Sequence, residues 1–251
     1  MPRFVNLPGI AAIVAAICLW QLAASVGPAS DLESFPSPAE VASGLGEMVT
    51  EGSLFGALQH TIVVTVIASA IGISAGALIG VLLGLVPPIR LFAGSTFDVL
   101  RTIPMVALMP VALLLWGVGA KTEIIVASVA TTWPMLVNAT GGITGVHPRL
   151  REVGRVFQFS SAKTVRRLIL PAAAPQLLVG ARLAVVTALI AAIVAEMLVS
   201  PNGLGWALVS EQNSLQYARM WGIVVVCGIV GYLLNLLLVT AMHRFDETQR
   251  S

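Results

Sequence analysis

Residues 149–171 have the sequence RLREVGRVFQFSSAKTVRRLILP. This stretch holds six basic residues and a single acid, Glu152. A long uncharged run precedes it, and an apolar run interrupted by Arg182 alone follows it as far as Ala195. Uncharged runs of about 20 residues are long enough to cross a lipid bilayer as helices. A basic loop between two such runs is typical of the cytoplasmic side of a membrane protein.

The same stretch predicts a short helix with one apolar face. A helical arrangement places Leu150, Val153 and Phe157 on that face and turns the arginines away from it. A basic helix that lies on anionic lipid needs a wide apolar face. Here the face is interrupted by Gly154, Gln158, Ser160 and Ser161. A groove on another protein is therefore a better partner for this segment than a lipid surface.

The composition of the whole chain agrees with a membrane protein. Of its 251 residues, 57% are hydrophobic and only 10% are charged, whereas about a quarter of the residues of a soluble domain are charged. Backbone groups in lipid have to be satisfied within the segment, so we expect an all-α integral membrane fold. The two cysteines lie in apolar runs and indicate no redox function.

We predict six transmembrane helices in a single transmembrane domain, 1–251, with both termini in the cytoplasm. No lysine or arginine occurs between Arg3 and Arg90, so the acidic loop after the first span is expected outside the cell. The first span has an alternative interpretation as a secretory signal, since Arg3 precedes it and small residues end it. The predicted spans are approximately 7–27, 57–86, 93–117, 122–143, 172–198 and 220–243.

Two local patterns predict further structure. Ser37, Pro38 and Glu40 form a helix-start signature, which predicts a surface helix over 37–50 on the outer side. Glycines recur every four residues within the second span, so they share one helix face and allow another helix to pack closely. These glycines are Gly72, Gly76, Gly80 and Gly84.

Charged residues within or near the membrane are candidates for the translocation pathway or its gating. They are Asp98, Arg101, Arg182 and Glu196. Arg182 lies near the middle of its span, where it attracts an anion or pairs with Asp98 to hold two helices in register; the pairing is favoured. Glu196 precedes a segment rich in helix breakers and is expected to mark the outer mouth of the fifth helix.

Several chemistries have little support. No Walker-type phosphate loop occurs, so the chain does not hydrolyse ATP by that route. The Gly72-Ile73-Ser74-Ala75-Gly76 pattern lies in mid-span rather than in a strand-to-helix turn, which argues against a catalytic serine. The histidines, His60, His147 and His243, have no clustered carboxylates in the sequence, so no metal site is expected. Nothing points to nucleic acid.

At the basic loop the sequence resembles the permeases of ABC importers. Glu152-Val153-Gly154, then Gln158, then Leu168 and Leu170-Pro171 resemble the loop Glu-Ala-Ala-x3-Gly-x9-Ile-x-Leu-Pro of that family. The resemblance extends over nearly the whole chain and is similar to the nitrate, sulfonate, taurine and bicarbonate group, which includes permeases for aromatic acids and for vitamin or pyrimidine precursors. Further matching segments are Phe35-Pro36-Ser37-Pro38, Leu100-Arg101-Thr102-Ile103-Pro104, Val179-Gly180-Ala181-Arg182 and Gly203-Leu204-Gly205-Trp206.

The resemblance implies a type I importer permease with the MetI-like fold, in the inner membrane of a bacterial cell. It implies two cytoplasmic ATPase subunits, a second permease copy and an extracytoplasmic substrate-binding protein as partners, besides membrane lipid. This chain then needs no cofactor of its own, and ATP and magnesium belong to the partner ATPase. The solute is expected to be small and anionic.

The resemblance also implies that residues 149–163 form a coupling helix that docks on the ATPase. The implied docking residues are Glu152, Val153, Gly154, Arg155, Phe157, Gln158 and Pro171, with Leu170-Pro171 setting the turn into the fifth helix. Val153, Gly154 and Gln158 depart from the two alanines and the glycine of the family pattern. Gln158 matters most, because glycine permits a bend that glutamine resists.

Two rival functions remain at the level of sequence. An ATP-independent channel or secondary carrier needs an ion-coupling site or inverted repeats, and neither is evident. An intramembrane enzyme needs a nucleophile with a base, or a metal set, within reach. Survival of transport or activity without an ATPase partner would distinguish both rivals from an importer subunit.

Overall fold

The computed structural model describes residues 7–26 and 32–250, and all regular structure in these ranges is helical. The elements are α1 (Leu7–Val26), α2 (Pro38–Glu51), α3 (Ser53–Leu85), α4 (Pro87–Leu100), the 3₁₀ helix η1 (Met105–Leu108), α5 (Met109–Trp116), α6 (Ala120–Thr144), α7 (Arg149–Val156), α8 (Ser161–Thr164), the π-helix η2 (Val165–Ile169), α9 (Leu170–Val199), α10 (Gly203–Asn213) and α11 (Tyr217–Arg250).

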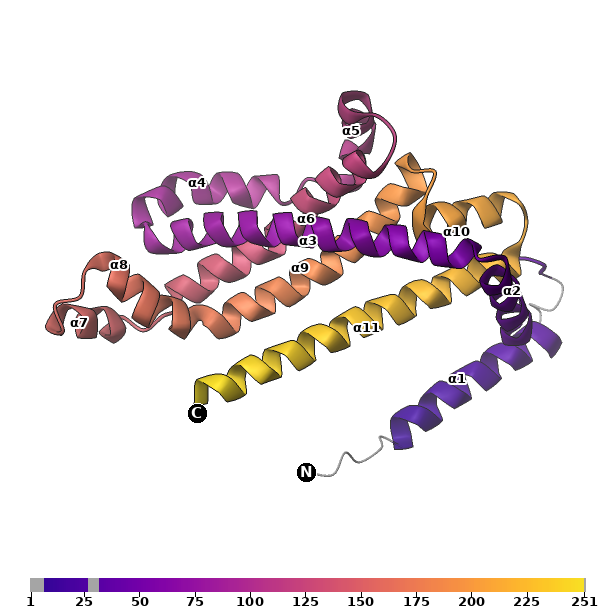
Figure 1. The fold of residues 1–251 in the computed structure, drawn as a ribbon, viewed down its shortest axis with the longest axis horizontal. Helices are drawn as coiled ribbons and strands as arrows, with labels where there is room; N and C mark the ends of the chain where they lie inside the picture. The colour runs from indigo at the N-terminus through magenta and orange to yellow at the C-terminus, as the bar shows by residue number, and fades with distance from the viewer. Residues whose placement is uncertain (1–6, 27–31, 251) are drawn as a thin grey trace.

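Helices α3, α6 and α9 form the centre of the molecule (Figure 1). The predicted glycine face of α3 packs against α6, as expected. A Cβ atom built on Gly80 would lie 2.6 Å from the Cβ of Ala139, and the Thr140 hydroxyl donates a hydrogen bond to the Gly80 carbonyl at 3.2 Å. Any larger residue would push the helices apart, so the glycines set the spacing of this pair.

Four helical segments are long and apolar enough to cross a membrane: Ser53–Leu85, Ala120–Thr144, Ser161–Val199 and Tyr217–Thr240. A fifth span results if α4 and the η1–α5 segment are counted together. The apolar part of α1, Ala11–Val26, is shorter than a span by the same criterion. The sixth span therefore stays a prediction, as does the placement of both termini.

The third span is not the continuous helix expected over 93–117. Helix α4 ends at Leu100 and a short non-helical segment follows. The next helical segment, Met105–Trp116, is bent by 81° relative to α4. The cause is local, because a proline disfavours helical geometry in the residue before it and lacks an amide hydrogen. Pro104 supplies both effects, in the Thr102-Ile103-Pro104 segment after the end of α4.

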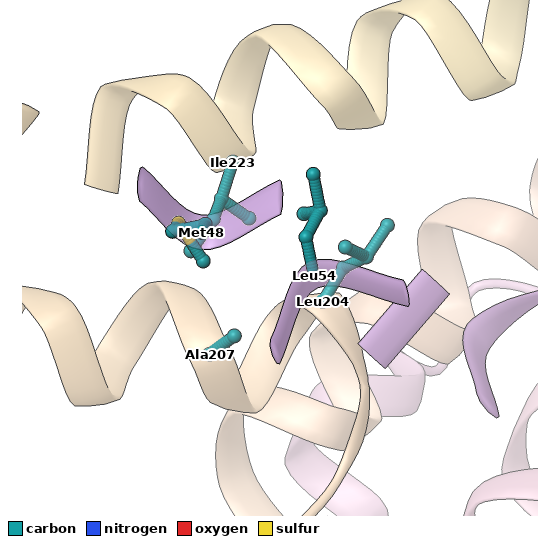
Figure 2. Packing of buried hydrophobic residues seen from close by; sticks show 5 residues of the cluster. All are labelled: Met48, Leu54, Leu204, Ala207 and Ile223. Carbon is teal, nitrogen blue, oxygen red and sulfur yellow. The ribbon is translucent and has the colours of Figure 1, made fainter. Parts of the chain in front are cut away.

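Figure 1 places α7 and α8 at one end of the long helices and α2 and α10 at the other. At the α2 end, a buried apolar cluster joins four helices (Figure 2). Met48 comes from α2, Leu54 from α3, Leu204 and Ala207 from α10, and Ile223 from α11. This cluster gives the loop segments at that end a core of their own.

Helix α2 is positioned by caps and by a charged contact. The predicted capping box is present: the Glu40 carboxylate accepts the Ser37 amide at 2.7 Å, and the Ser37 hydroxyl oxygen accepts the Glu40 amide at 3.3 Å. Arg219 at the start of α11 lies within 2.9 Å of Glu47 and 2.6 Å of Glu51. Arg219 therefore forms ion pairs with two acids of the predicted outer loop, which the sequence pattern did not indicate.

Candidate functional site

The basic loop forms a compact helical hairpin. Helix α7 ends at Val156, and the Phe159 amide donates to the Gly154 carbonyl at 2.8 Å, which closes the turn. Gln158 has a φ angle of +51°, in the left-handed region that favours glycine. The bend implied by the family glycine is therefore made here by glutamine. Ser160 then caps α8 by accepting the Lys163 amide at 3.3 Å.

Gly154 lies where the two arms of this hairpin touch. It is buried, and a Cβ atom at this position would lie 2.7 Å from the Thr164 hydroxyl oxygen and 2.9 Å from the Thr164 methyl carbon. Such distances are shorter than side chains tolerate without a shift. The glycine at the position of the family's second alanine therefore allows Thr164 to approach closely.

The other predicted docking residues of the hairpin face outward. Glu152, Val153, Arg155, Phe157 and Gln158 are all exposed. Val156, which was not among the predicted docking residues, is the most exposed apolar residue of the hairpin at 79%, with Phe157 at 66%. Exposed apolar side chains on and beside a short helix in which half of the residues are charged are typical of a contact surface.

Pro171 does not set a turn into the fifth helix. The chain is helical without a break from Ser161 to Val199, and Pro171 lies exposed within it. The preceding turns widen into η2, where the Leu170 amide bonds to the Val165 carbonyl. A π-helical turn accommodates a missing proline amide, so the reversal of chain direction lies upstream at Gln158. The expected turn at Leu170-Pro171 is wrong.

The expected pairing of Arg182 with Asp98 is also wrong in this structure. Asp98 pairs with Arg101 three residues later on the chain at 3.1 Å, and both side chains are largely exposed. The Arg182 Nε donates instead to the Asn235 side-chain oxygen at 2.7 Å, which joins α9 to α11. Asp98 and Arg101 line a cavity of about 240 Å³ between α3, α4 and α6.

Glu196 is completely buried rather than at an open mouth. One carboxylate oxygen, Oε2, accepts the Gly205 amide at 2.9 Å and the Thr61 hydroxyl at 2.9 Å. The Thr61 oxygen in turn accepts the Leu204 amide at 2.9 Å. Glu196 and Thr61 thus satisfy the first free amides of α10, where a negative charge is favoured.

His60 has carboxylate partners, contrary to the expectation from sequence. Its Nε2 lies 2.8 Å from Oε2 of Glu123, which is also completely buried. One donor atom from each of His60, Glu123 and Glu196 lies within 4.8 Å of the other two. The three residues are up to 136 positions apart in the chain, so only the packing of α3, α6 and α9 brings them together.

Comparison with known proteins agrees with this architecture. Residues 72–251 match the family model described as the inner membrane component of binding-protein-dependent transport systems. The chain belongs to this family. The match begins at Gly72 and includes the hairpin, the broken third span and Glu196.

Individual relatives are permeases. The putative aliphatic sulfonates transport permease of Bacillus subtilis is 29% identical over 231 residues, which cover 92% of this chain and 83% of that protein. The corresponding Escherichia coli protein is 30% identical and covers 89% and 84%. The nitrate import permease of a Synechocystis strain is 32% identical over 55% of this chain and 50% of its own length.

Solved structures share the fold. The MetNI methionine ABC transporter in an inward-facing conformation matches with a TM-score of 0.68 at 19% identity, over 78% of this chain and 97% of the matched one. An amino acid ABC transporter matches with a TM-score of 0.63 at 20% identity, over 81% and 97%. The permease is thus a multi-pass inner membrane protein with the importer permease fold.

Proposed function

We propose that this permease carries a sulfonate, or a chemically related small oxyanion, through the membrane as part of an ATP-driven importer. The observation that supports the substrate class best is the likeness to sulfonate permeases over about nine-tenths of the chain. The assembly proposed is two copies of this chain, two ATPase subunits that bind ATP and magnesium, and one external binding protein.

The hairpin is the proposed contact with the ATPase. Its exposed apolar side chains, Val153, Val156 and Phe157, are flanked by Glu152 and several arginines. The helix that leaves it is continuous as far as Val199, at the opposite end of the molecule. A displacement of the hairpin on ATP binding would therefore move a stiff element whose far end bears Glu196. This is a physical route from the ATPase to the outer side.

A charge reversal in the hairpin tests the docking contact. We expect Glu152→Lys to abolish co-purification of the ATPase subunit while the permease still inserts. Glu33→Lys, which makes the same charge change at an exposed position at the α2 end, is the matched control and should leave the complex intact. Wild-type association of Glu152→Lys would contradict the assignment.

The substrate class is tested by uptake into proteoliposomes that contain the complete complex and its binding protein. We expect ATP-dependent uptake of an alkanesulfonate, with Arg182→Gln reducing uptake about tenfold or more and Arg182→Lys reducing it less, because a charged hydrogen bond to an anion contributes about 1.5–3 kcal/mol. Unchanged uptake by an intact Arg182→Gln complex would show that Arg182 does not bind the transported anion. Uptake without the ATPase would instead support a secondary carrier.

A further inference from the structure

Helices α3, α6 and α9 bring an imidazole and two carboxylates together at the end of the molecule that carries α2 and α10. His60 lies in the second turn of α3, Glu123 in the first turn of α6 and Glu196 in the last turn of α9. Each offers a donor atom within 4.8 Å of the donor atoms of the other two. The hairpin contact does not use this cluster, and of its three residues only Glu196 is also a candidate for the transport pathway.

Two carboxylate oxygens of the cluster have no hydrogen-bond partner among the described residues. Glu123 binds His60 through Oε2, and Glu196 binds Thr61 and Gly205 through Oε2. The Oε1 atoms of both acids are buried and have no hydrogen-bond partner among the described residues. A buried carboxylate oxygen without a partner is costly, which points to a missing positive ligand.

The charges of the cluster favour a divalent cation. Two ionised carboxylates carry two negative charges, and a protonated His60 would balance only one of them. A divalent cation bound to neutral imidazole and two carboxylates balances both and leaves no net charge in a buried place. His60 is partly exposed, with 21% of its side chain accessible, so it provides the entrance for an ion.

We propose that His60, Glu123 and Glu196 bind one divalent transition metal ion of the zinc class. One imidazole and two carboxylates are a ligand set that zinc accepts, with a fourth position left for water. Magnesium and calcium prefer all-oxygen sites. Ligand atoms around tetrahedral zinc lie about 3.3 Å apart, so the ion replaces the 2.8 Å contact between Nε2 of His60 and Oε2 of Glu123 with one bond from each atom to the metal. It fastens the ends of α3, α6 and α9 together.

Direct metal analysis tests this site without reference to transport. The complete complex, purified through a tag without histidine, is stripped with a chelator, equilibrated with zinc sulfate and freed of excess metal. Elemental analysis is expected to find one zinc per permease chain. Wild-type complex that retains no zinc would overturn the proposal, and protonation of the carboxylates would then account for the unmet oxygens.

Variants show where the metal binds. His60→Gln and Glu123→Gln are expected to weaken zinc binding at least about tenfold, since even outer-shell changes at metal sites have effects of that size. His147→Gln, at an exposed turn before α7, is the control and should bind as wild type does. Zinc that persists in the double variant His60→Gln, Glu123→Gln would overturn the assignment.

Spectroscopy keeps the test decisive where a variant does not fold. X-ray absorption at the zinc edge of the wild-type complex is expected to show one imidazole nitrogen with carboxylate oxygens. Two imidazoles, or sulfur, would place the metal elsewhere. Magnesium in place of zinc is expected to bind at least tenfold more weakly, and equal binding would argue against the mixed ligand set.

Discussion

Gln158 has a backbone conformation that residues with a Cβ atom rarely adopt. Its φ angle of +51° produces the reversal between α7 and α8, at the position where the family pattern has glycine. A non-glycine residue in the left-handed region costs about 1–2 kcal/mol. The departure from the family pattern therefore changes the strain in the hairpin rather than its course.

Replacing this residue by glycine is expected to stabilise the hairpin. Gln158→Gly removes the strain but adds freedom to the unfolded chain, which leaves a net gain of about 0.5–1 kcal/mol. The measurement is the melting temperature of the purified complex, together with hydrogen exchange at residues 154–164. Gln212→Gly, at an exposed helical position in α10, should instead destabilise by a similar amount. A loss of stability in Gln158→Gly would show that the strain argument is wrong.

Glu40 gives a pH-dependent cap. The Ser37 amide, followed by the Ser37 hydroxyl, lowers the pKa of the Glu40 carboxyl below its ordinary value of 4.5. A group whose folded-state pKa is lowered stabilises the fold above its unfolded pKa and loses that contribution as the pH falls. We therefore expect the start of α2 to be protected near pH 7 and to fray below about pH 4.5.

Hydrogen exchange of the amides of residues 37 and 39–41 between pH 7 and pH 3.5 checks this expectation, after correction for the intrinsic pH dependence of exchange. Glu40→Gln should show little pH dependence in this segment. Equal pH dependence in the variant and in the wild type would assign the effect to another group.

Residue contacts were predictable only where partners are close in the chain. The Ser37–Glu40 capping box follows from spacing alone, because the two residues share one helical turn. His60 and Glu123 are 63 positions apart, and Arg219 and Glu47 are 172 apart. Their contacts follow from how the helices pack, which a single sequence does not encode by spacing. The same limit explains the mistaken pairing of Arg182 with Asp98.

At the scale of elements, the glycine face of α3 could be predicted because its period of four matches the helix. Gly80→Ala should destabilise the permease by about 1–3 kcal/mol, because the new methyl group would overlap Ala139 and the Leu136 carbonyl. Gly56→Ala, on the same helix with nothing within 4 Å, should be neutral or stabilising by up to about 1 kcal/mol.

The melting temperatures of Gly80→Ala and Gly56→Ala relative to wild type test whether the α3–α6 contact requires glycine at position 80. If both alanines have the same effect, the α3–α6 contact does not depend on the absence of a side chain. A selective loss in Gly80→Ala with Gly56→Ala unchanged supports the packing.

The break in the third span could not be derived from apolar length. Residues 93–117 are apolar enough for one span, yet the segment bends by 81° between α4 and η1. Hydropathy reports how much apolar surface a segment has, whereas the bend depends on Pro104 and on where α5 finds a packing partner. That partner is a buried cluster shared with α6 and α9, including Met109, Val126 and Ala195. The bend depends on this packing, and it cannot be predicted from the composition of the segment.

At the scale of the whole molecule, the fold places the two candidate functional regions at opposite ends of the long helices. The hairpin, which is the proposed ATPase contact, lies at one end, and α2 and α10 lie at the other (Figure 1). The cluster of His60, Glu123 and Glu196 lies beside α10, because Glu196 accepts the Gly205 amide. The basic loop and the acidic loop predicted opposite sides of the membrane from charge alone. In the structure the two loops lie at opposite ends of α3 and α9.

Labelling of single cysteines tests this separation. In a background with Cys18→Ser and Cys227→Ser, we expect Val156→Cys on α7 to react with a membrane-impermeant thiol reagent only from the cytoplasmic side, because it is 79% exposed at the hairpin. Val49→Cys on α2 is 63% exposed and should react only from outside. Ser214→Cys, in the turn before α11, should behave as Val49→Cys does.

The pattern of labelling also decides how the bent third segment crosses. Between α2 and α7 the chain passes through α3, the bent pair and α6, and three crossings bring α7 to the side opposite α2. If the bent pair were a re-entrant loop, only two crossings would remain, and both cysteines would react from the same side. Opposite sides for Val49→Cys and Val156→Cys therefore require the bent pair to span the membrane.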